Sequence, residues 1–407
     1  MGPSHLSLFP GRSIRRLGVS LFGALLAGVS ACAPSEPPAA LARAITAAYP
    51  ANPCLVNVEY SFDRIPDKVR SSSLFGSTSK YLGARNTLIP WPRYTSQSEN
   101  NFGLEEHFQG IQRLGAWDHT TGRHFVLSGG IKNGTPQKSQ LIVFEMGTQP
   151  ATGPWALPDY GYDYENPPAA DRTVAVVDID TTYWHAGGIQ ALNNLVAVPL
   201  YGDGTGSEVR YFDLQVPTAP VELSGIRLSR PHTTSNAAAL TVLPNGYYMT
   251  LVWDDQNLEF HLSNSTDVLA GFQGGFQRVA PAEVVGGFAG GGCGSSGCGT
   301  YQSINFVNQC DGTVYLVAAR NTQLASPTVT GTDYASLYRV TWPGGDYGAK
   351  PTVTWVKRRQ FYCYNQQCNF GAAAGVYAND GDHLYLYGAS HWLHNGNARY
   401  NYNEYSY

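Results

Sequence analysis

Three histidines precede segments of similar composition, and side chains of this type could bind a ligand or carry out chemistry. His107 and His185 begin the stretches HFQGIQRL and HAGGIQAL, which share histidine, Gly-Ile-Gln and leucine at the same positions. His232 precedes a third run that starts with small residues, SNAAALTVL. Imidazole nitrogens hydrogen-bond polar ligands and also coordinate metals, so the residue types alone leave both kinds of site open.

Amide and phenol side chains lie close to these histidines or at matching places in the chain. Such hydrogen-bonding groups beside aromatic rings are typical of sites for sugars and other small polar molecules. Three neutral imidazoles and a carboxylate could instead hold a metal that activates water, as in a hydrolase or lactonase. A third alternative is structural, with the histidines hydrogen-bonding neighbouring loops, and it is favoured over catalysis. The predicted ligand-binding residues are His107, Gln109, His185, His232, Asn236, Tyr301 and Gln302.

The elements that would position these side chains repeat along the chain. After residue 53 no long segment has the 3.6-residue period of a helix, and short apolar runs are separated by Gly, Pro, Asn and Asp. Asn-Gly and Asp-Gly pairs between apolar runs predict β-hairpins. Five segments share one plan of small residues, an apolar run, a turn and a second apolar run: GIQRLGAWDHTTGRHFVLSGG, GGIQALNNLVAVPLYG, SNAAALTVLPNGYYMTLVWD, YQSINFVNQCDGTVYLVAARN and FGAAAGVYANDGDHLYLYGAS.

Five such hairpins, most followed by one or two further strand candidates, predict an all-β fold of the β-propeller type. The expected number of blades is five, with six as the alternative. Inner strands of a propeller converge on its axis, which explains small residues such as Gly187, Gly188 and Ala237. The Gly-Ile-Gln repeat is therefore interpreted as the mark of an inner strand. We expect LVNVEYSF (55–62) and RYNYNEYSY (399–407) to close the final blade from both termini.

The same topology predicts where the histidines lie. His107, His185 and His232 each come shortly before an inner strand, and Tyr301 occupies the corresponding place in a fourth copy. Equivalent positions of successive blades face the same end of a propeller. The three histidines are therefore expected to surround one polar pocket at the mouth of the central channel.

The N-terminal residues are predicted to direct export and membrane attachment. A basic head precedes the apolar run LGVSLFGALLAGV, which has the order of a secretory signal and is short for a bilayer-spanning helix. Val29-Ser30-Ala31-Cys32, at the end of this run, resembles a lipobox, in which the cysteine is acylated. We therefore expect a signal peptide at 1–31, a Pro/Ala-rich tether at 32–53 that is lipid-anchored through Cys32, and a propeller domain at 54–407.

The cysteine count agrees with this organisation. The chain has seven cysteines, so assigning Cys32 to lipid leaves an even number for disulfides in an oxidising compartment. Two pairs share a four-residue gap, Cys293 with Cys298 and Cys363 with Cys368. Cys54 and Cys310 then remain as a third pair, although six cysteines allow about 15 connectivities.

Several functional classes are disfavoured by composition and motifs. The formal net charge is −4 and basic clusters are absent, which argues against nucleic-acid binding. No nucleophile elbow, phosphate-binding loop, His-Glu-x-x-His or calcium loop is found, so no cofactor or metal is predicted. No catalytic residue is assigned, and whether the chain is an enzyme stays open.

The propeller pattern and the lipobox together resemble bacterial β-propeller lipoproteins of unassigned activity. The resemblance covers most of residues 55–407 and transfers no catalytic residues, because fold alone does not determine function. It implies an extracytoplasmic, membrane-anchored protein of the bacterial cell envelope. The predicted function is binding of a small polar ligand, a glycan or a protein partner at the channel mouth. The alternative is the metal-assisted hydrolase or lactonase at the same mouth.

Overall fold

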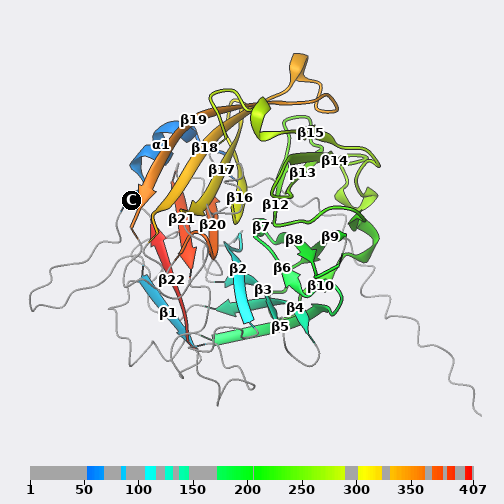
Figure 1. Ribbon diagram of the computed structural model, residues 1–407, viewed down its shortest axis with the longest axis vertical. Coiled ribbons are helices and arrows are strands. Elements are labelled where there is room, and N and C mark those ends of the chain that lie inside the picture. Colours follow the sequence, from blue (N-terminus) through cyan, green and yellow to red (C-terminus); the bar gives the residue numbers. More distant parts are fainter. Residues whose placement is uncertain are drawn as a thin grey trace, which may run out of the picture. The chain divides into compact units, whose positions relative to one another are not determined.

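The protein is a five-bladed β-propeller (Figure 1). The computed structural model describes residues 53–67, 84–88, 106–115, 124–131, 137–145, 172–204, 206–288, 301–322, 331–362, 369–378, 383–389 and 399–405. All of them belong to one compact unit, Ala47–Tyr407. The predicted number of five blades is confirmed for the described residues.

Each blade is an antiparallel sheet whose strands run in order from the inner edge outward. The first blade contains β2 (Glu106–Arg113), β3 (His124–Ile131), β4 (Lys138–Glu145) and β5 (Arg172–Asp180). The second contains β6 (His185–Ala186) with β7 (Gln190–Leu192), then β8 (Leu195–Tyr201), β9 (Ser207–Asp213), and β10 (Val221–Glu222) with β11 (Leu228–Arg230). The third contains β12 (Ala237–Val242), β13 (Tyr248–Trp253), β14 (Leu258–Leu262) and β15 (Gln277–Val279).

The last two blades complete the ring. The fourth contains β16 (Ser303–Asn308), β17 (Val314–Asn321), β18 (Asp333–Thr341) and β19 (Thr352–Phe361). The fifth contains β20 (Ala373–Ala378), β21 (Leu384–Ala389), β22 (Arg399–Tyr405) and β1 (Ala84–Leu88). In the part of the chain that the structure describes, short 3₁₀ turns lie in connections at Ser224–Ile226, Val268–Ala270, Pro281–Glu283 and Pro343–Gly345.

Strands from both ends of the chain close the fifth blade, as predicted, but the N-terminal strand is not the expected one. β1 pairs antiparallel with β22, from Ala84 opposite Asn403 to Leu88 opposite Arg399. The expectation that the segment 55–62 provides this strand is wrong. Leu55 makes one bridge to Gln309 in the fourth blade, and the helix α1 (Val58–Arg64) follows.

The local sequence explains why 55–62 becomes helical. The Asn57 side chain accepts a hydrogen bond from the backbone N–H of Tyr60, which caps the first turn of α1. Val58 and Phe62, four residues apart, are both fully buried, as on one face of a helix. Together with Leu55 and Ile65 they pack into the hydrophobic cluster between the fourth and fifth blades. Helical spacing of the apolar residues therefore outweighs the β-branched and aromatic composition.

The small residues of the inner strands allow backbones to meet at the axis. A Cβ atom on Gly187 would lie 2.0 Å from the carbonyl oxygen of Asn236, and one on Gly188 would lie 2.0 Å from that of Gln302. Asn236 and Gln302 precede the inner strands of the third and fourth blades. Since the second and fourth blades are not neighbours in the ring, the contact of Gly188 with Gln302 crosses the axis. This confirms the interpretation of the glycines as inner-strand residues.

The glutamines of the two Gly-Ile-Gln stretches form buried hydrogen bonds at the axis. Gln190 Oε1 accepts hydrogen bonds from the backbone N–H groups of Leu240 (3.0 Å) and Phe306 (2.8 Å), while its Nε2 donates to the Phe306 carbonyl (2.9 Å). Gln112 Nε2 donates to Asn305 Oδ1 at 3.2 Å, and Asn305 Nδ2 donates to the Ile189 carbonyl at 3.1 Å. The first four blades are thus joined across the axis at the level of these side chains.

Packing between neighbouring blades is hydrophobic and rich in aromatic rings. Phe125 and Phe144 of the first blade contact Tyr402 of the fifth, at ring-centroid distances of 5.2 and 6.1 Å. Between the third and fourth blades, Phe288 contacts both Trp253 and Tyr301 at 5.1 Å. Such inter-blade packing is where the hydrophobic effect stabilises the ring.

The hairpin predictions hold wherever the turns are described. Gly246 and Gly312 adopt positive φ angles of 84° and 90° in the Pro-Asn-Gly and Cys-Asp-Gly turns, and Asn193 has φ 52° in the Asn-Asn turn. The Thr-Thr-Gly and Asn-Asp-Gly turns lie outside the described residues. The outer edge of the second blade, at residues 221–230, is not one continuous strand but is divided into β10, a 3₁₀ turn and β11.

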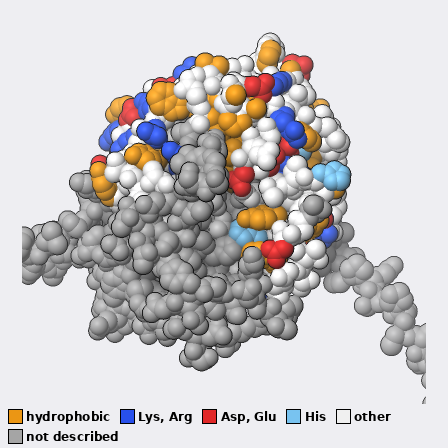
Figure 2. Space-filling view, viewed as in Figure 1, with side chains coloured by type: hydrophobic (Ala, Val, Ile, Leu, Met, Phe, Trp, Pro, Cys, Tyr) orange, Lys and Arg blue, Asp and Glu red, His pale blue; other side chains and the backbone are white. Residues whose placement is uncertain are grey.

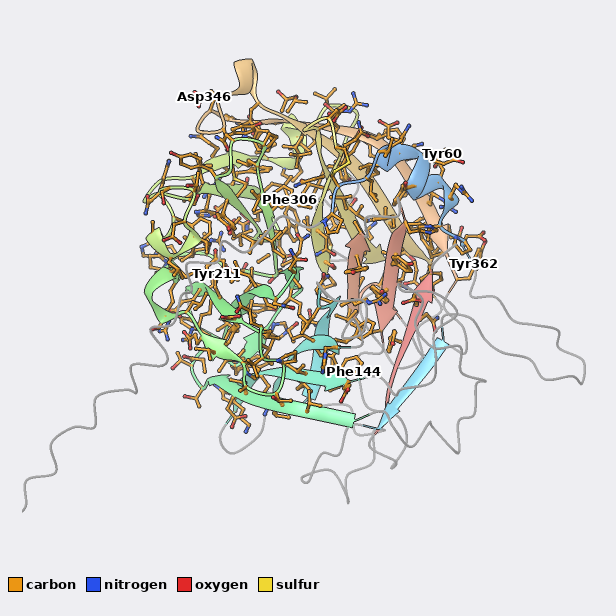
Figure 3. The ribbon with its side chains drawn as sticks, turned by 180° about the vertical axis from the view of Figure 1, so that it is seen from behind. Tyr60, Phe144, Tyr211, Phe306, Asp346 and Tyr362 are labelled. Carbon is orange, nitrogen blue, oxygen red and sulfur yellow. A yellow bond between two sulfur atoms is a disulfide. The ribbon has the colours of Figure 1, made fainter. Side chains whose placement is uncertain are left out.

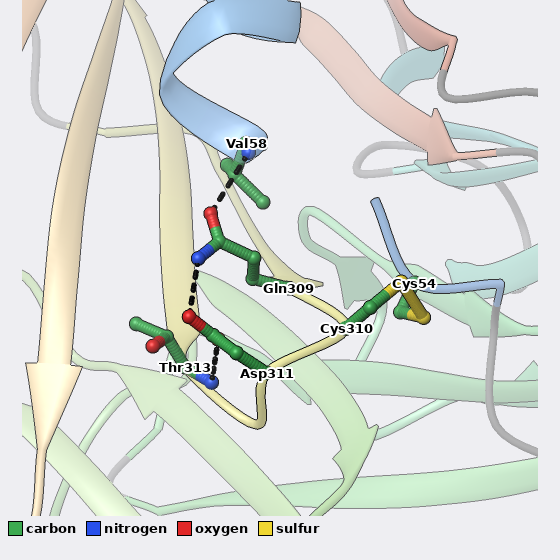
Figure 4. Close-up of a disulfide and its surroundings, with 6 residues drawn as sticks. All are labelled: Cys54, Val58, Gln309, Cys310, Asp311 and Thr313. Atoms are coloured by element: carbon green, nitrogen blue, oxygen red, sulfur yellow. Dashed lines mark hydrogen bonds between the residues drawn. A yellow bond between two sulfur atoms is a disulfide. The ribbon is translucent and has the colours of Figure 1, made fainter. Parts of the chain in front are cut away.

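A disulfide joins the segment before α1 to the turn between β16 and β17. Cys54 is bonded to Cys310 across a sequence separation of 256 residues, which confirms this pairing (Figure 4). Gln309, beside Cys310, accepts a hydrogen bond from the Val58 backbone N–H at 3.1 Å and donates to Asp311 at 2.7 Å. The other disulfide candidates, Cys293, Cys298, Cys363 and Cys368, lie outside the described residues, as does Cys32. In the described ranges, no helix has the length and apolar character needed to span a membrane.

The axial hydrogen bonds predict a large effect of a single substitution. Gln190→Ala leaves two backbone N–H groups and one carbonyl buried without partners, so the free energy of unfolding should fall by roughly 3 kcal/mol or more. Urea denaturation measures this change. Gln256 is exposed in a turn, and Gln256→Ala should change stability by less than about 0.5 kcal/mol. Equal stability of the two variants would contradict the role assigned to Gln190.

Candidate functional site

The predicted site residues lie at or near the beginnings of the inner strands, and we call this end of the propeller the strand-start face. It is the face at which the inner strands begin, marked by His185, Ala237, Ser303 and Ala373. The parallel pairings of Gly110 with Ala374 and of Gly188 with Ala237 show that neighbouring inner strands run in the same direction. The second strand of each blade ends on this face, so the connections between second and third strands lie there too.

His185 is the centre of a group of aromatic and polar side chains on this face. Its Nε2 is 3.3 Å from the hydroxyl of Tyr201, the last residue of β8, and the two rings are 4.2 Å apart. Trp184 packs edge-on against the imidazole at 5.1 Å. His185 and Trp184 are buried and Tyr201 is partly exposed. The group therefore places a partly exposed tyrosine against a buried imidazole.

A carboxylate from the third blade completes this group. Asp255 has a left-handed backbone, φ 70°, in the turn after β13. Burial, together with the negative charge of Asp255, raises the pKa of Tyr201. The phenol therefore stays protonated and can both donate and accept hydrogen bonds. We call Trp184, His185, Tyr201 and Asp255 the His185 cluster; Figure 2 shows histidine, acidic and hydrophobic side chains side by side over β6 and β8.

Close backbone packing positions the cluster. A Cβ atom on Gly130, at the end of β3, would lie 2.3 Å from the Trp184 carbonyl oxygen. A Cβ atom on Gly202 would lie 2.3 Å from the Thr182 carbonyl oxygen. Asp180 accepts hydrogen bonds from the backbone N–H groups of Thr182 and Tyr183, at 2.7 and 2.8 Å, and thereby fixes the turn before Trp184. The cluster thus rests on a rigid backbone.

The residues predicted in the first blade are only partly described. His107 lies in β2 opposite Gly130, and its side chain is outside the described residues. Gln109 is buried in β2, at the register shift between Phe108 and Gly110.

Two further predicted residues precede β12. Asn236 is buried, and its backbone N–H and carbonyl bond Trp253 and Gly188. His232 is exposed, between β11 and β12. His185 and His232 therefore share the strand-start face but differ in environment. Whether the three histidines surround one pocket stays a prediction.

The predicted residues of the fourth blade take part mainly in packing. Tyr301 is fully buried, and its hydroxyl bonds that of Tyr338 at 2.6 Å. Burial, and then the neighbouring Tyr338, raise its pKa well above the ordinary value. Gln302 is partly exposed and bonds the Ala319 carbonyl through its backbone N–H at 3.1 Å.

A buried ionic network lies between the second and third blades. Arg230 donates to Glu259 Oε2 from Nε (3.0 Å) and Nη2 (2.5 Å), and Arg278 bonds the other carboxylate oxygen at 2.8 Å. The Arg230 guanidinium also donates to the Thr234 carbonyl and to Ser235 Oγ (2.6 Å), and it lies 3.6 Å from Asp254. Arg230 therefore ties the loop that carries His232 to the body of the third blade.

Metal chemistry would need several His, Cys, Asp or Glu side chains grouped among the described residues. Among them, no three His, Cys, Asp or Glu side chains are arranged to hold a metal ion. The metal-dependent alternative stays a prediction, since the side chain of His107 is not described. The sequence did not single out Tyr201 or Asp255, because neither has a distinctive motif and their proximity depends on the meeting of two blades.

His261 in the network predicts a pH dependence of stability. It lies 3.9 Å from Glu259 and packs on Phe276, and burial, together with Arg230, lowers its pKa to about 3. Between about pH 6.5 and 3 the unfolded chain binds a proton at His261 and the folded chain does not. The free energy of unfolding therefore falls, as the pH falls, by up to about 1.4 kcal/mol for each pH unit. His261→Gln should flatten the melting temperature between pH 6.5 and 4.5 while changing it little at pH 8. Parallel curves for both proteins would contradict this role.

Comparisons with known proteins identify no family for this chain. No protein-family model matches it, and no curated protein matches it. Among solved structures it is similar to an endo-arabinase from Bacteroides thetaiotaomicron, with 10% identity, a TM-score of 0.44, and coverage of 79% of this chain and 97% of that one. It is also similar to an α-L-arabinofuranosidase from Podospora anserina, with 8% identity, a TM-score of 0.34, and coverage of 79% and 97%. At these scores the likenesses carry no conclusion about substrate or activity.

Proposed function

We propose that this chain is a lipid-anchored, extracytoplasmic β-propeller that binds a small polar ligand, such as a glycan, at the His185 cluster. The observation that carries the proposal is the cluster itself, in which Tyr201, partly exposed, lies on the buried His185 at 3.3 Å. Aromatic rings beside hydrogen-bonding groups suit the apolar faces and hydroxyl groups of a sugar.

The hydrogen bonds across the axis support binding on the strand-start face rather than deep inside a channel. Gln112, Gln190 and Asn305 form these bonds, and the backbones of Gly188 and Gln302 are in contact. A ligand bound on the strand-start face is therefore surrounded by the connections between the second and third strands of the blades. Loops carried by a rigid scaffold are a common location for binding residues.

The proposal is one of recognition rather than catalysis. Asp255 is partly exposed beside Tyr201, whereas Asp254 is buried and accepts the backbone N–H groups of Gln256 and Asn257. Asp254 therefore shapes the turn that presents Asp255. The Asp255 carboxylate, which influences the Tyr201 phenol, suits hydrogen bonding to the hydroxyl groups of a ligand.

Substitution of the phenol tests the binding site. A glycan array and a thermal-shift screen of small polar molecules would first identify a ligand of the wild-type protein. Tyr201→Phe removes one hydroxyl group and should weaken binding about 5- to 10-fold, corresponding to about 1 kcal/mol. Isothermal titration measures the dissociation constants.

A matched control distinguishes the site from general destabilisation. The Tyr211 hydroxyl bonds Thr250 at 2.9 Å inside the propeller, and Tyr211→Phe should bind the ligand like wild type. Equal affinities of Tyr201→Phe and wild type would place the ligand elsewhere.

The membrane anchor requires its own test. The lipobox Val29-Ser30-Ala31-Cys32 supports acylation of Cys32, which would attach residues 33–53 and the propeller to the membrane. Cys32→Ser should move the protein from the membrane fraction to the soluble fraction of a bacterial host, as measured by immunoblotting. A variant that still sediments with membranes, and is not extracted by high salt, would refute anchoring through this residue.

A further inference from the structure

The helix α1 gives the rim of the propeller an exposed aromatic surface. Val56 and Tyr60 are 73% and 52% exposed, while Val58 and Phe62 of the same segment are buried. Tyr362 follows β19, is 46% exposed, and bonds the Asp67 carbonyl through its backbone N–H at 2.9 Å. Figure 3 shows Tyr60 and Tyr362 on the same side of the molecule. We call Val56, Tyr60, Arg64 and Tyr362 the α1 surface.

Cationic side chains surround the aromatic rings of this surface. Arg64 lies over the Tyr60 ring at 5.5 Å and donates to its hydroxyl at 3.2 Å. Arg359 of β19 lies over the Phe62 ring at 6.0 Å. Figure 2 shows Lys and Arg side chains mixed with hydrophobic ones over α1 and β19.

Ion pairs neutralise the acidic groups of α1. Glu59 accepts a hydrogen bond from Arg339 at 2.6 Å, and Asp63 accepts one from Lys357 at 2.7 Å. The negative charges of the helix are thus balanced by strands β18 and β19. Repulsion between α1 and an anionic surface is correspondingly reduced, and Arg64 is exposed at the end of the helix.

The position of this surface matches the expected path to the membrane. The Cys54–Cys310 disulfide fixes the chain four residues before α1 begins. Residues 33–53 connect Cys54 to Cys32 and can span at most about 70 Å when fully extended. A tether of limited length raises the effective concentration of the α1 surface at the membrane, so even weak contacts between the two become populated.

We infer that the α1 surface rests on the phospholipid membrane, an inference that depends on the proposed anchor at Cys32. Tyr60 and Tyr362 occupy the headgroup region, where amphipathic aromatic rings are favoured. Arg64 pairs with lipid phosphate groups, and each Arg or Lys near an anionic membrane contributes favourably. Contact along this rim sets the orientation of the propeller on the membrane.

The experiment attaches the lipid chemically, so it does not depend on acylation in the cell. The chain from Cys32 onward, in which Cys32 is the thiol to be coupled, is joined to a maleimide lipid in vesicles containing phosphatidylglycerol. Hydroxyl-radical footprinting with mass spectrometry then compares tethered with untethered protein. Tyr60 and Tyr362 should be modified at least threefold more slowly when tethered, and 0.5 M salt should reduce this protection.

Controls separate membrane contact from general shielding. Phe276, 42% exposed on the third blade, should be modified at the same rate in both samples. Arg64→Glu with Tyr60→Ser should remove the protection of Tyr362, whereas Lys350→Gln, an exposed substitution elsewhere on the fourth blade, should not. Unchanged rates at Tyr60 and Tyr362, or equal protection of Phe276, would overturn the inference. Failure of the Cys32→Ser fractionation test would instead refute the natural anchor and leave this measurement unaffected.

Discussion

The fold depends on how closely the inner strands approach one another at the axis. Gly187 and Gly188 lie against the carbonyl oxygens of Asn236 and Gln302, where any side chain would collide with backbone. This approach leaves backbone groups of the inner strands facing one another, and Gln112, Gln190 and Asn305 bond to them. Burying a side-chain amide costs free energy unless its hydrogen bonds are made. Because these bonds form only when the blades are placed as observed, they specify the arrangement of the blades.

Closure of the ring uses three separate links. β1 adds the outer strand to the fifth blade, α1 fills the seam between the fourth and fifth blades, and the Cys54–Cys310 disulfide fixes the segment before α1. Arg113 strengthens the seam between the first and fifth blades, since its guanidinium lies over the Tyr377 ring at 4.9 Å. The fifth blade is therefore held differently on its two sides, by hydrophobic packing and the disulfide-fixed segment toward the fourth blade and by a cation–π contact toward the first.

Much of the architecture can be predicted from the sequence because it is written in local patterns. Turn residues and alternating apolar runs locate the hairpins, and small residues locate the inner strands. The prediction for 55–62 fails because its composition suits a strand, whereas Asn57 and the spacing of Val58 and Phe62 favour a helix. β1 lies in the segment ARNTL, whose polar composition carries no strand signal.

The site is less predictable because it depends on contacts between blades. The sequence correctly places His185 at the start of an inner strand, but its partner Tyr201 belongs to the next strand and Asp255 to the next blade. The Gly-Ile-Gln repeat marks inner strands, yet nothing local indicates that Gln190 bonds the backbones of the third and fourth blades. Hydrogen bonds across an axis have no signature in a linear pattern.

The pairing of β1 with β22 has a consequence for biosynthesis. Ala84 cannot pair until Asn403, its partner in the register, has been synthesised. At typical rates of translation the time between the synthesis of these two residues is about 15–65 s. During this time the outer edge of the last blade does not exist, and the apolar faces of the earlier blades stay exposed at the open end of the ring. The newly made chain should therefore depend on chaperones that hold it unassembled until its last strand emerges.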